Sequence, residues 1–276
     1  MPDIICAMAD TVQPFDVVRF EDRRSNPDVD RVAAEVALEV RLEGEPFSVI
    51  MRTPGADEAL TAGFLFSESV IRGASDIDRI ESESPDVVNA ILSRQRATIV
   101  PEVLGQRRQV VMNSSCGMCG RRTLESLTVD RPQLAMRWNV RVETILSLPT
   151  ILRASQHAFG ATGGLHAAGL FDLDGRLELS AEDVGRHNAV DKLVGRMVLM
   201  DRLPLDHTLL FVSGRSSFEI VQKAFLAGIP LVGAVSAPSS LAIELARTAG
   251  ITLLGFVRDG RFNSYAHHQR IRKLET

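Results

Sequence analysis

The fold of this chain is decided by residues 209–235, LLFVSGRSSFEIVQKAFLAGIPLVGAV. Leu209–Val212 and Leu231–Val235 are uninterrupted apolar segments of strand length, and Phe218–Leu226 between them has helical character and ends at Gly228. Apolar strands that alternate with helices are typical of a parallel sheet covered by helices on both faces. The run therefore predicts an α/β architecture.

The alternation continues on both sides of this run. Toward the C-terminus, Ser240–Thr248 predicts a helix and Ile251–Val257 a third buried strand. Upstream, Glu143–Phe159 predicts a helix that Pro149 interrupts, and Asp174-Gly175 predicts a hairpin between two apolar segments. An amphipathic helix follows, because apolar residues recur at helical spacing at positions Val190, Leu193, Val194, Met197 and Val198.

The N-terminal half has the alternating pattern of half-buried antiparallel strands. We expect a hairpin from Val36–Leu42 and Phe47–Met51, a helix over Asp57–Ser69, and short strands at Ile77–Glu81 and Asp86–Ser93. Residues 94–109 are polar and predict a loop, and Arg121–Leu127 predicts a short helix. The predicted organisation is a polar, irregular lead-in over 1–33, an α+β domain over 34–140, and an α/β domain with a largely parallel sheet over 141–276.

Composition limits the classes of partner. The chain has 276 residues and a formal net charge of -4, so no basic field indicates DNA or another nucleic acid as its main partner. No apolar run approaches the length that spans a membrane, and the N-terminus has no signal-peptide pattern. Three cysteines do not make a disulfide framework, and we expect a cytoplasmic protein.

Two of the three cysteines, Cys116 and Cys119, stand two residues apart in Asn113-Ser-Ser-Cys-Gly-Met-Cys-Gly120. A structural zinc site needs four ligands, and Cys6 is the only other cysteine, so we expect no bound zinc or other metal. A redox pair and a nucleophilic or carrier thiol, activated by a following helix and by Arg121 and Arg122, remain open. Spacing alone leaves the carrier, redox and zinc interpretations as close competitors.

The loops that follow the parallel strands are the candidate binding edge, because right-handed crossovers bring them together. Ser213–Ser217 ends one strand and opens a helix, so Gly214 and Arg215 suit an anionic ligand. His187 begins the amphipathic helix and is a further candidate, although a lone histidine there is more often a cap. Phe256–Arg261 ends the third strand, and its two arginines fit a phosphate or a guanine unless the run is an ordinary solvated turn.

Taken together, several stretches resemble the FdhD family, the formate dehydrogenase accessory sulfurtransferases, from about Glu35 to Arg270. The motifs that carry the resemblance are Thr61-Ala-Gly-Phe-Leu-Phe66, Ser115-Cys-Gly-Met-Cys-Gly120, Thr162-Gly-Gly-Leu-His166, Glu182-Asp-Val-Gly-Arg-His-Asn-Ala-Val-Asp-Lys192, Ser213-Gly-Arg215 and Gly260-Arg261. Several motifs in order are far more specific than any one of them.

The resemblance implies that the chain is a sulfur carrier, an enzyme of the sulfurtransferase type. It also implies that formate dehydrogenase needs this carrier in order to be active. A cysteine desulfurase would load sulfur as a persulfide on Cys116, with Cys119 assisting, and the sulfur would pass to the molybdenum of the bis-molybdopterin guanine dinucleotide cofactor. The cofactor-binding run of the family falls on Phe256, Val257, Arg258, Asp259, Gly260 and Arg261. GDP or GMP would then mimic the guanine nucleotide half of the cofactor.

The resemblance also implies a C-terminal half with the homodimeric α/β/α fold of cytidine deaminases. The deaminase signature is absent, because Ala189 stands where the catalytic glutamate belongs and Ser213–Ser217 contains no cysteine. Deamination is therefore excluded. Two hypotheses remain: a sulfurtransferase that acts on the molybdenum cofactor, and a cofactor-binding chaperone for formate dehydrogenase in which the cysteine pair is structural or binds a metal.

Overall fold

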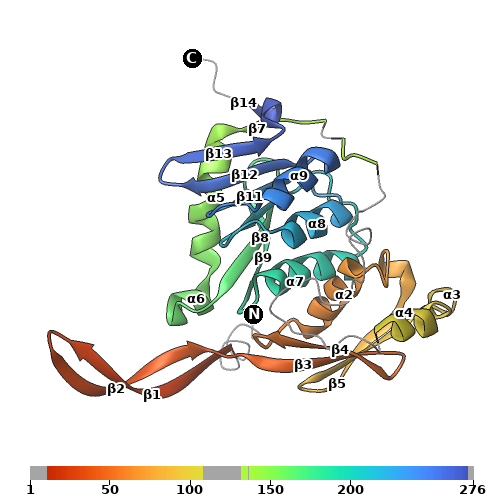
Figure 1. The fold of residues 1–276 in the computed structure, drawn as a ribbon, viewed down its shortest axis with the longest axis horizontal. Helices are drawn as coiled ribbons and strands as arrows, with labels where there is room; N and C mark the ends of the chain where they lie inside the picture. The colour runs from red at the N-terminus through yellow and green to blue at the C-terminus, as the bar shows by residue number, and fades with distance from the viewer. Residues whose placement is uncertain (1–10, 108–131, 136, 273–276) are drawn as a thin grey trace.

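The computed structural model describes residues 11–107, 132–135 and 137–272, with the backbone alone for 104–107. Its centre is a six-stranded sheet in the order β13-β12-β11-β10-β8-β9 (Figure 1). The six strands are β8 (His166–Phe171), β9 (Leu177–Asp183), β10 (Leu209–Val212), β11 (Leu231–Ala234), β12 (Thr252–Arg258) and β13 (Arg261–Ala266). The predicted α/β class is confirmed.

The direction of the strands refines the expectation of a largely parallel sheet. β10, β11 and β12 are parallel neighbours, with Leu231 opposite both Leu209 and Thr252. β8 and β13 run antiparallel to their neighbours, so only the three central strands form parallel pairs and the sheet is mixed. Hairpins join β12 to β13 and β8 to β9, and a hairpin forces antiparallel pairing, whereas β8 and β10 pair antiparallel although β9 and α7 (Arg186–Leu199) separate them in the chain.

Helices cover both faces of this sheet (Figure 1). α5 (Val142–Ser155) packs Ile145, Leu148 and Leu152 against Phe171 and Phe211 in one buried cluster. The other face is covered by α7 (Arg186–Leu199), α8 (Phe218–Ala227) and α9 (Ser240–Ala249), in a second and larger cluster. The result is the expected three-layer α/β/α arrangement.

The helix predicted over Glu143–Phe159 is two helices in the structure. α5 continues through Pro149 and ends at Ser155, and α6 (His157–Thr162) starts after Gln156, whose ψ of 75° is not helical. The carboxylate of Glu182 accepts hydrogen bonds from the N–H groups of Ala158 and Phe159, which holds the start of the second helix in place. The interruption therefore lies at Gln156 and not at the proline.

The N-terminal part is a second, four-stranded sheet in the order β4-β3-β6-β5, which packs on α2 (Asp57–Ser67). Its strands are β3 (Val36–Leu42), β4 (Glu45–Arg52), β5 (Ile77–Ser84) and β6 (Val87–Leu92), and the 3-10 turn η1 (Ala74–Asp76) precedes β5. The predicted hairpin, helix and two strands are confirmed. Leu38 and Leu60 belong to the same buried cluster as Val190 and Ile220, so one core joins the two halves.

The contact between α2 and α7 depends on two glycines. A Cβ on Gly63 would overlap the backbone of Asp191, and a Cβ on Gly195 would overlap the backbone of Ala59. The two helices therefore approach backbone to backbone, which larger side chains would prevent. Gly63 is the glycine of the Thr61–Phe66 motif, and its role is to set this helix pair.

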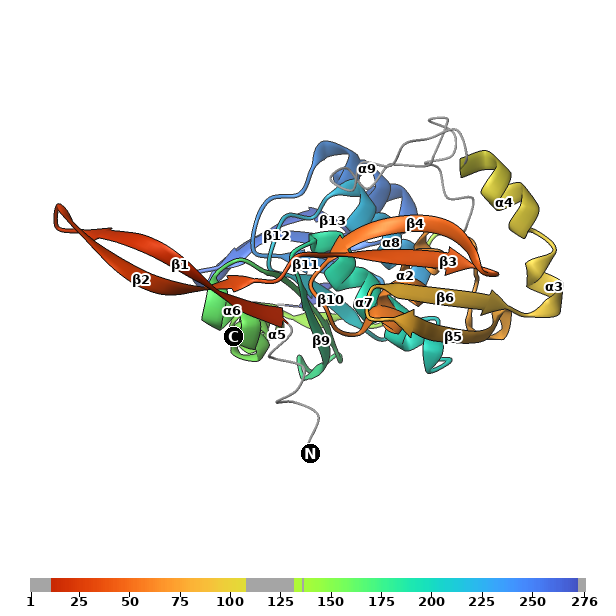
Figure 2. The same ribbon diagram turned by 90° about the horizontal axis from the view of Figure 1, so that it is seen from below.

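The lead-in over 1–33 is not irregular where the structure describes it. β1 (Val12–Glu21) and β2 (Arg24–Ala33) pair antiparallel along their full length and project from the body beyond β3 (Figure 2). All but three of their twenty residues are exposed. A hairpin with no core under either face lacks the clean apolar–polar alternation that identifies half-buried strands, which explains the wrong prediction.

Three further differences concern polar segments. Residues 94–107 form α3 (Arg94–Ala97) and α4 (Val100–Arg107) where a loop was expected. β13 was not predicted, nor were β7 (Val140–Arg141) and β14 (Ile271–Arg272), which pair with each other next to the 3-10 turn η3 (His268–Arg270). The helix predicted over Arg121–Leu127 lies outside the described residues.

The chain reaches the C-terminal part before residue 141. The N–H of Leu134 donates to the carbonyl of Ala249, and the indole of Trp138 donates to the carbonyl of Asp206. Among the helices that the structure describes, none has both the length and the apolar character needed to cross a membrane.

Candidate functional site

Three loops meet at the carboxyl edge of β10, β11 and β12, as the sequence predicts. The N–H of Ser236 donates to the carbonyl of Gly214 at 3.4 Å, and the N–H of Phe256 donates to the carbonyl of Ser236 at 3.2 Å. The N–H of Ser239 donates to the carbonyl of Ser216 at 3.0 Å. These hydrogen bonds join the loop that holds Gly214 to the start of the run Phe256–Arg261, so the edge is one continuous surface.

Basic side chains gather around the first of these loops. His166 begins β8, which is antiparallel to β10, so it lies at the same edge, and its ring is 3.2 Å from where a Cβ on Gly214 would stand. Burial lowers the pKa of His166, and the nearby Arg186, His187 and Arg215 lower it further, while Asp183 opposes them. Burial is therefore the main cause of the lowered pKa of His166, and the basic groups gathered at this edge add to it.

His187 is fixed by a hydroxyl and a carboxylate from the start of α8. Its Nε2 lies 3.1 Å from Ser217 Oγ and 3.6 Å from Glu219 Oε2. Burial alone would raise the pKa of Glu219, but hydrogen bonds from His187, Ser217 and its own backbone N–H outweigh burial and lower it from 4.5 to about 2. The first turn of α8 thus already holds an anion, a favourable place for negative charge.

Two buried polar atoms at this edge have no hydrogen-bond partner among the described residues. They are Oγ of Ser216, a residue with no exposed surface, and Nε of Arg186. Unpaired buried polar atoms are uncommon in native proteins and call for an explanation such as an unfilled site. Both residues lie in stretches that the sequence singles out, but burial without a hydrogen-bond partner has no signal in a sequence.

Three polar side chains of the Glu182–Lys192 motif hold the start of α7 in place. Asp183 accepts hydrogen bonds from the N–H of Gly185 at 2.8 Å and the side chain of Asn188 at 2.9 Å, and it pairs with Nζ of Lys192 at 2.7 Å. Asp183 and Lys192 are buried and Asn188 is half-buried, and such a network rigidifies the segment that carries it. This network positions Arg186 and His187 at the edge of the sheet.

The run Phe256–Arg261 spans the end of β12 and a two-residue turn. Asp259 and Gly260 have φ of 53° and 71°, the pattern of a type I′ turn, and Arg258 pairs directly with Arg261 across it. Like charges directly opposite each other are destabilising, and Asp259 Oδ2, 3.8 Å from Arg258 Nε, offsets part of this repulsion. The type I′ turn accounts for the glycine at position 260. The paired side chains of Arg258 and Arg261 suit a phosphate.

Phe256 and Val257, in the same run, differ in what they can offer a ligand. Phe256 has a φ of 54°, a genuine outlier for a bulky residue, and its ring centroid lies 5.7 Å from the guanidinium carbon of Arg258. Strained residues of this kind cluster at binding sites. The side chain of Val257 is buried in the core under α5, so only its backbone is available to a ligand.

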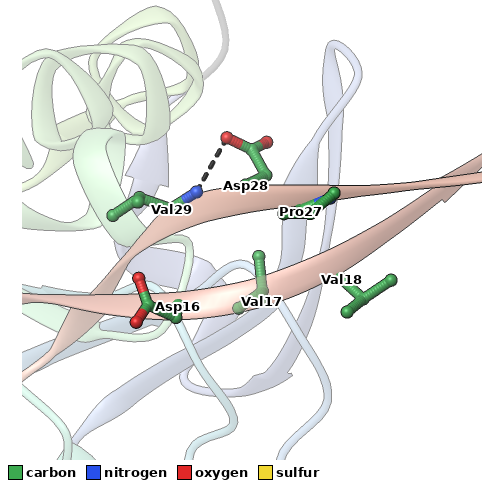
Figure 3. A pocket seen from close by; sticks show the side chains of 6 residues that line it. All are labelled: Asp16, Val17, Val18, Pro27, Asp28 and Val29. Carbon is green, nitrogen blue, oxygen red and sulfur yellow. Dashed lines mark hydrogen bonds between the residues drawn. The ribbon is translucent and has the colours of Figure 1, made fainter.

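Cys116 and Cys119 lie outside the described residues. Within the described part of the chain, no group of three or more His, Cys, Asp or Glu side chains could hold a metal ion. That finding does not bear on the cysteine pair. A shallow hollow of about 530 Å³ occurs on the β1–β2 hairpin (Figure 3) and is lined by Asp16, Val17, Val18, Pro27, Asp28 and Val29.

Comparison with known proteins agrees with the motifs. The model of the FdhD/NarQ family matches residues 33–272. The sulfur carrier protein FdhD of Saccharolobus solfataricus is 44% identical over 264 residues, which cover 94% of this chain and 98% of that protein. The protein of the same name from Streptomyces coelicolor is 46% identical over 265 residues, 92% of this chain and 94% of its own length.

A solved structure from Desulfotalea psychrophila, assigned as a formate dehydrogenase accessory protein, has the same fold. It covers 95% of this chain and 100% of its own, with a TM-score of 0.77 and 25% sequence identity. The chain belongs to the FdhD/NarQ family.

Proposed function

We propose that this chain is a sulfur carrier that serves formate dehydrogenase by delivering sulfur to its molybdenum cofactor. The observation that supports the proposal most strongly is identity of 44–46% over nearly the whole chain to proteins named sulfur carrier protein FdhD. The chain also retains Cys116 and Cys119, the type of thiol pair that such a transfer needs.

The proposed chemistry starts with a persulfide on a cysteine desulfurase. The thiolate of Cys116 attacks the outer sulfur of that persulfide, the donor's S–S bond breaks, and its electron pair leaves with the donor thiolate. Cys116 then carries the outer sulfur as its own persulfide. The thiolate of Cys119 then attacks the inner sulfur on Cys116, the persulfide S–S bond breaks, and the outer sulfur leaves as sulfide for the molybdenum centre of the cofactor, which is the substrate. The disulfide left between Cys116 and Cys119 is reduced by thiols of the reducing compartment.

The proposed cofactor site is the carboxyl edge of the central sheet. The paired Arg258 and Arg261 suit phosphate groups, and the ring of Phe256 offers a stacking surface for a guanine base. Arg186 and Ser216 add two buried groups that lack partners among the described residues. We propose the guanine dinucleotide part of the cofactor as the occupant and GDP as its simplest mimic.

Assembly and location complete the proposal. We propose a homodimer that works in the cytoplasm, where reducing conditions keep both thiols free between transfers. Formate dehydrogenase is the proposed recipient of the sulfurated cofactor.

Intact mass and peptide mapping test the sulfur step. The full chain is incubated with an active cysteine desulfurase and free cysteine, and Cys116→Ala, Cys119→Ala and Cys6→Ala are treated in parallel. We expect a reductant-sensitive gain of one sulfur in the wild type and in Cys6→Ala, and none in Cys116→Ala. An equal gain in Cys116→Ala would refute the assignment of the carrier thiol.

Calorimetric titration with GDP tests the binding edge separately. Arg258→Ser and Arg261→Ser should each weaken GDP binding at least about tenfold, the discrimination expected for a charge-assisted contact. Arg176→Ser is the matched control, since Arg176 is exposed at the opposite edge of the same sheet. GDP binding without sulfur loading would favour the cofactor-binding chaperone over the sulfur carrier.

A further inference from the structure

The N-terminal half of the chain makes a buried polar contact with the segment that carries Arg186 and His187. The contact is made by Thr53, the residue that follows β4, and Thr53 is only 1% exposed. α7 lies between the central sheet and the N-terminal half, so its start is within reach of the end of β4 (Figure 1). Thr53 belongs to none of the motifs that carry the family resemblance, which therefore assign it no role.

Thr53 uses all of its hydrogen-bonding groups. Its N–H donates to Oδ2 of Asp183 at 3.2 Å, and its carbonyl accepts from Nζ of Lys192 at 2.8 Å. Its hydroxyl oxygen accepts from the N–H of Val184 at 3.2 Å and donates to the carbonyl of Ala34 at 2.9 Å. Three of these four hydrogen bonds tie the end of β4 to the chain between the end of β9 and the second turn of α7.

The start of α7 depends on such outside support. Gly185 is at the N-cap position and has no side chain with which to cap the helix, and the first N–H groups of a helix have no partner within it. The side chain of Asn188 donates to the carbonyl of Met51 in β4 at 2.8 Å, a second link to the same strand. The end of β4 therefore fixes the place from which Arg186 and His187 extend.

The place of Arg186 matters because of how its side chain is left. Its Nε is buried and has no hydrogen-bond partner among the described residues. A guanidinium recognises a phosphate through a planar fork of N–H donors, so its direction decides how well it binds. His187 has a second support in Ser217, whose Oγ lies 3.1 Å from its Nε2. Arg186 is thus the residue whose aim depends most on the segment that carries it.

We propose that Thr53 is a positioning residue for the binding edge, which holds the segment 183–187 so that Arg186 faces the phosphate groups of the ligand. The inference rests on the proposed cofactor site and adds to it a residue from the other half of the chain. Thr53 is too deeply buried to touch a ligand, so it acts through the start of α7. Without its hydroxyl, the N–H of Val184 loses its acceptor, which is costly at a half-buried position.

Calorimetric titration of the full chain with GDP tests the proposal. Thr53→Val replaces the hydroxyl with a methyl group of similar size, and it should raise the dissociation constant about fivefold or more, the equivalent of one lost hydrogen bond. Thr53→Ser keeps the hydroxyl and should stay within about twofold of the wild type. Asn188→Ala removes the second link to β4 and should also weaken binding, so the test does not depend on a single variant.

Thr61→Val is the matched control, because Thr61 is also a buried threonine of the N-terminal half. Its side chain has no exposed surface, and its hydroxyl has no hydrogen-bond partner among the described residues. The substitution should leave GDP affinity unchanged. Thermal melting followed by circular dichroism checks that each variant is folded at the titration temperature. Folded Thr53→Val and Asn188→Ala that bind GDP as tightly as the wild type, or a Thr61→Val as weak as Thr53→Val, would overturn the proposal.

A double variant distinguishes positioning from a general structural role. Arg186→Gln should weaken GDP binding, and adding Thr53→Val to it should cost less than about a further twofold, because two changes that act through one group are not additive. A further loss as large as that in the wild-type background would show that Thr53 does not act through Arg186, and would overturn the inference.

The same titrations separate this inference from the proposed function. If wild-type protein does not bind GDP, the proposed cofactor site is wrong, and the role of Thr53 falls with it. If wild-type protein binds GDP but Thr53→Val and Asn188→Ala have no effect, only the role of Thr53 is wrong. Loading of sulfur on Cys116 by a cysteine desulfurase should be unchanged in Thr53→Val, and a parallel loss of loading would contradict a role confined to the binding edge.

Discussion

Replacing Glu219 with glutamine removes the negative charge that the first turn of α8 holds. The pKa of this carboxyl falls from 4.5 to about 2 in the folded protein, which corresponds to roughly 3 kcal/mol of folding free energy if fully realised. The side chain retains 16% exposure, and solvent screening reduces the expected contribution to about 1–2 kcal/mol. Glu219→Gln should lower the free energy of unfolding at pH 7 by that amount.

The pH dependence follows from the direction of the pKa shift. A carboxyl with a lowered folded-state pKa contributes stability that is present above its unfolded pKa, near 4.5, and is lost as pH falls toward about 2. The difference in unfolding free energy between wild type and Glu219→Gln should therefore be constant from pH 7 to pH 6. By about pH 3 it should have fallen by more than half.

Urea unfolding followed by circular dichroism at a series of pH values measures this difference. Glu244→Gln is the matched control, because Glu244 is exposed on the neighbouring α9 and its replacement changes the net charge equally. The control should track the wild type throughout. A Glu219→Gln difference that is absent at pH 7, or one that does not shrink on acidification, would refute the assigned role of this carboxylate.

Three other predictions concern the helix contact, a buried ion pair and the binding edge. Gly63→Ala should lower the unfolding free energy by about 1–3 kcal/mol or more, because the added Cβ overlaps the backbone of Asp191, whereas Gly73→Ala meets open space and should be neutral in thermal melting. Lys223→Met removes the ammonium group that lies 2.7 Å from the buried carboxylate of Asp191. Urea unfolding should show that the free energy of unfolding falls by about 3–5 kcal/mol, and a fall of less than about 1 kcal/mol would contradict the pairing. Arg258→Ser should make GDP affinity less dependent on salt, and an unchanged salt slope in titrations would contradict a phosphate contact.

The C-terminal half could be predicted because its strands are buried on both faces. Leu209–Val212 has no exposed side chain, and the structure has a strand with the same bounds. Such a strand shows as a continuous apolar run, and the glycines at the ends of α8 and α9, Gly228 and Gly250, have the positive φ that ends helices. Both signals are local, so both are visible in a single sequence.

The β1–β2 hairpin and the polar helices could not be predicted from the same signals. β1 and β2 contain Pro14 and Pro27, residues typical of edge strands, and their pairing depends on no core. α4 has Pro101 in its first turn, where a proline is tolerated, but the segment has too few apolar residues for a periodic pattern. These elements are stabilised by contacts that local patterning does not encode.

At the binding edge too, some residues could be identified from local sequence signals and others could not. Gly214, Arg215 and His187 could be selected because each lies where a predicted strand ends or a predicted helix begins. Glu219 had an available signal, an acidic residue in the first turn after Ser217, which is favourable at a helix N-terminus. The unpaired Ser216 hydroxyl and its proximity to the Pro238 segment depend on pairing between loops that only the folded chain reveals.

The proposed function depends on sulfur being carried by Cys116, and mass spectrometry can detect that sulfur. Wild-type protein is incubated with cysteine desulfurase and free cysteine, and the peptide containing Cys116 and Cys119 is analysed by mass spectrometry before and after reduction. We expect one added sulfur atom on that peptide, and we expect the reductant to remove it. No added sulfur, with the desulfurase shown to be active in the same tube, would contradict it.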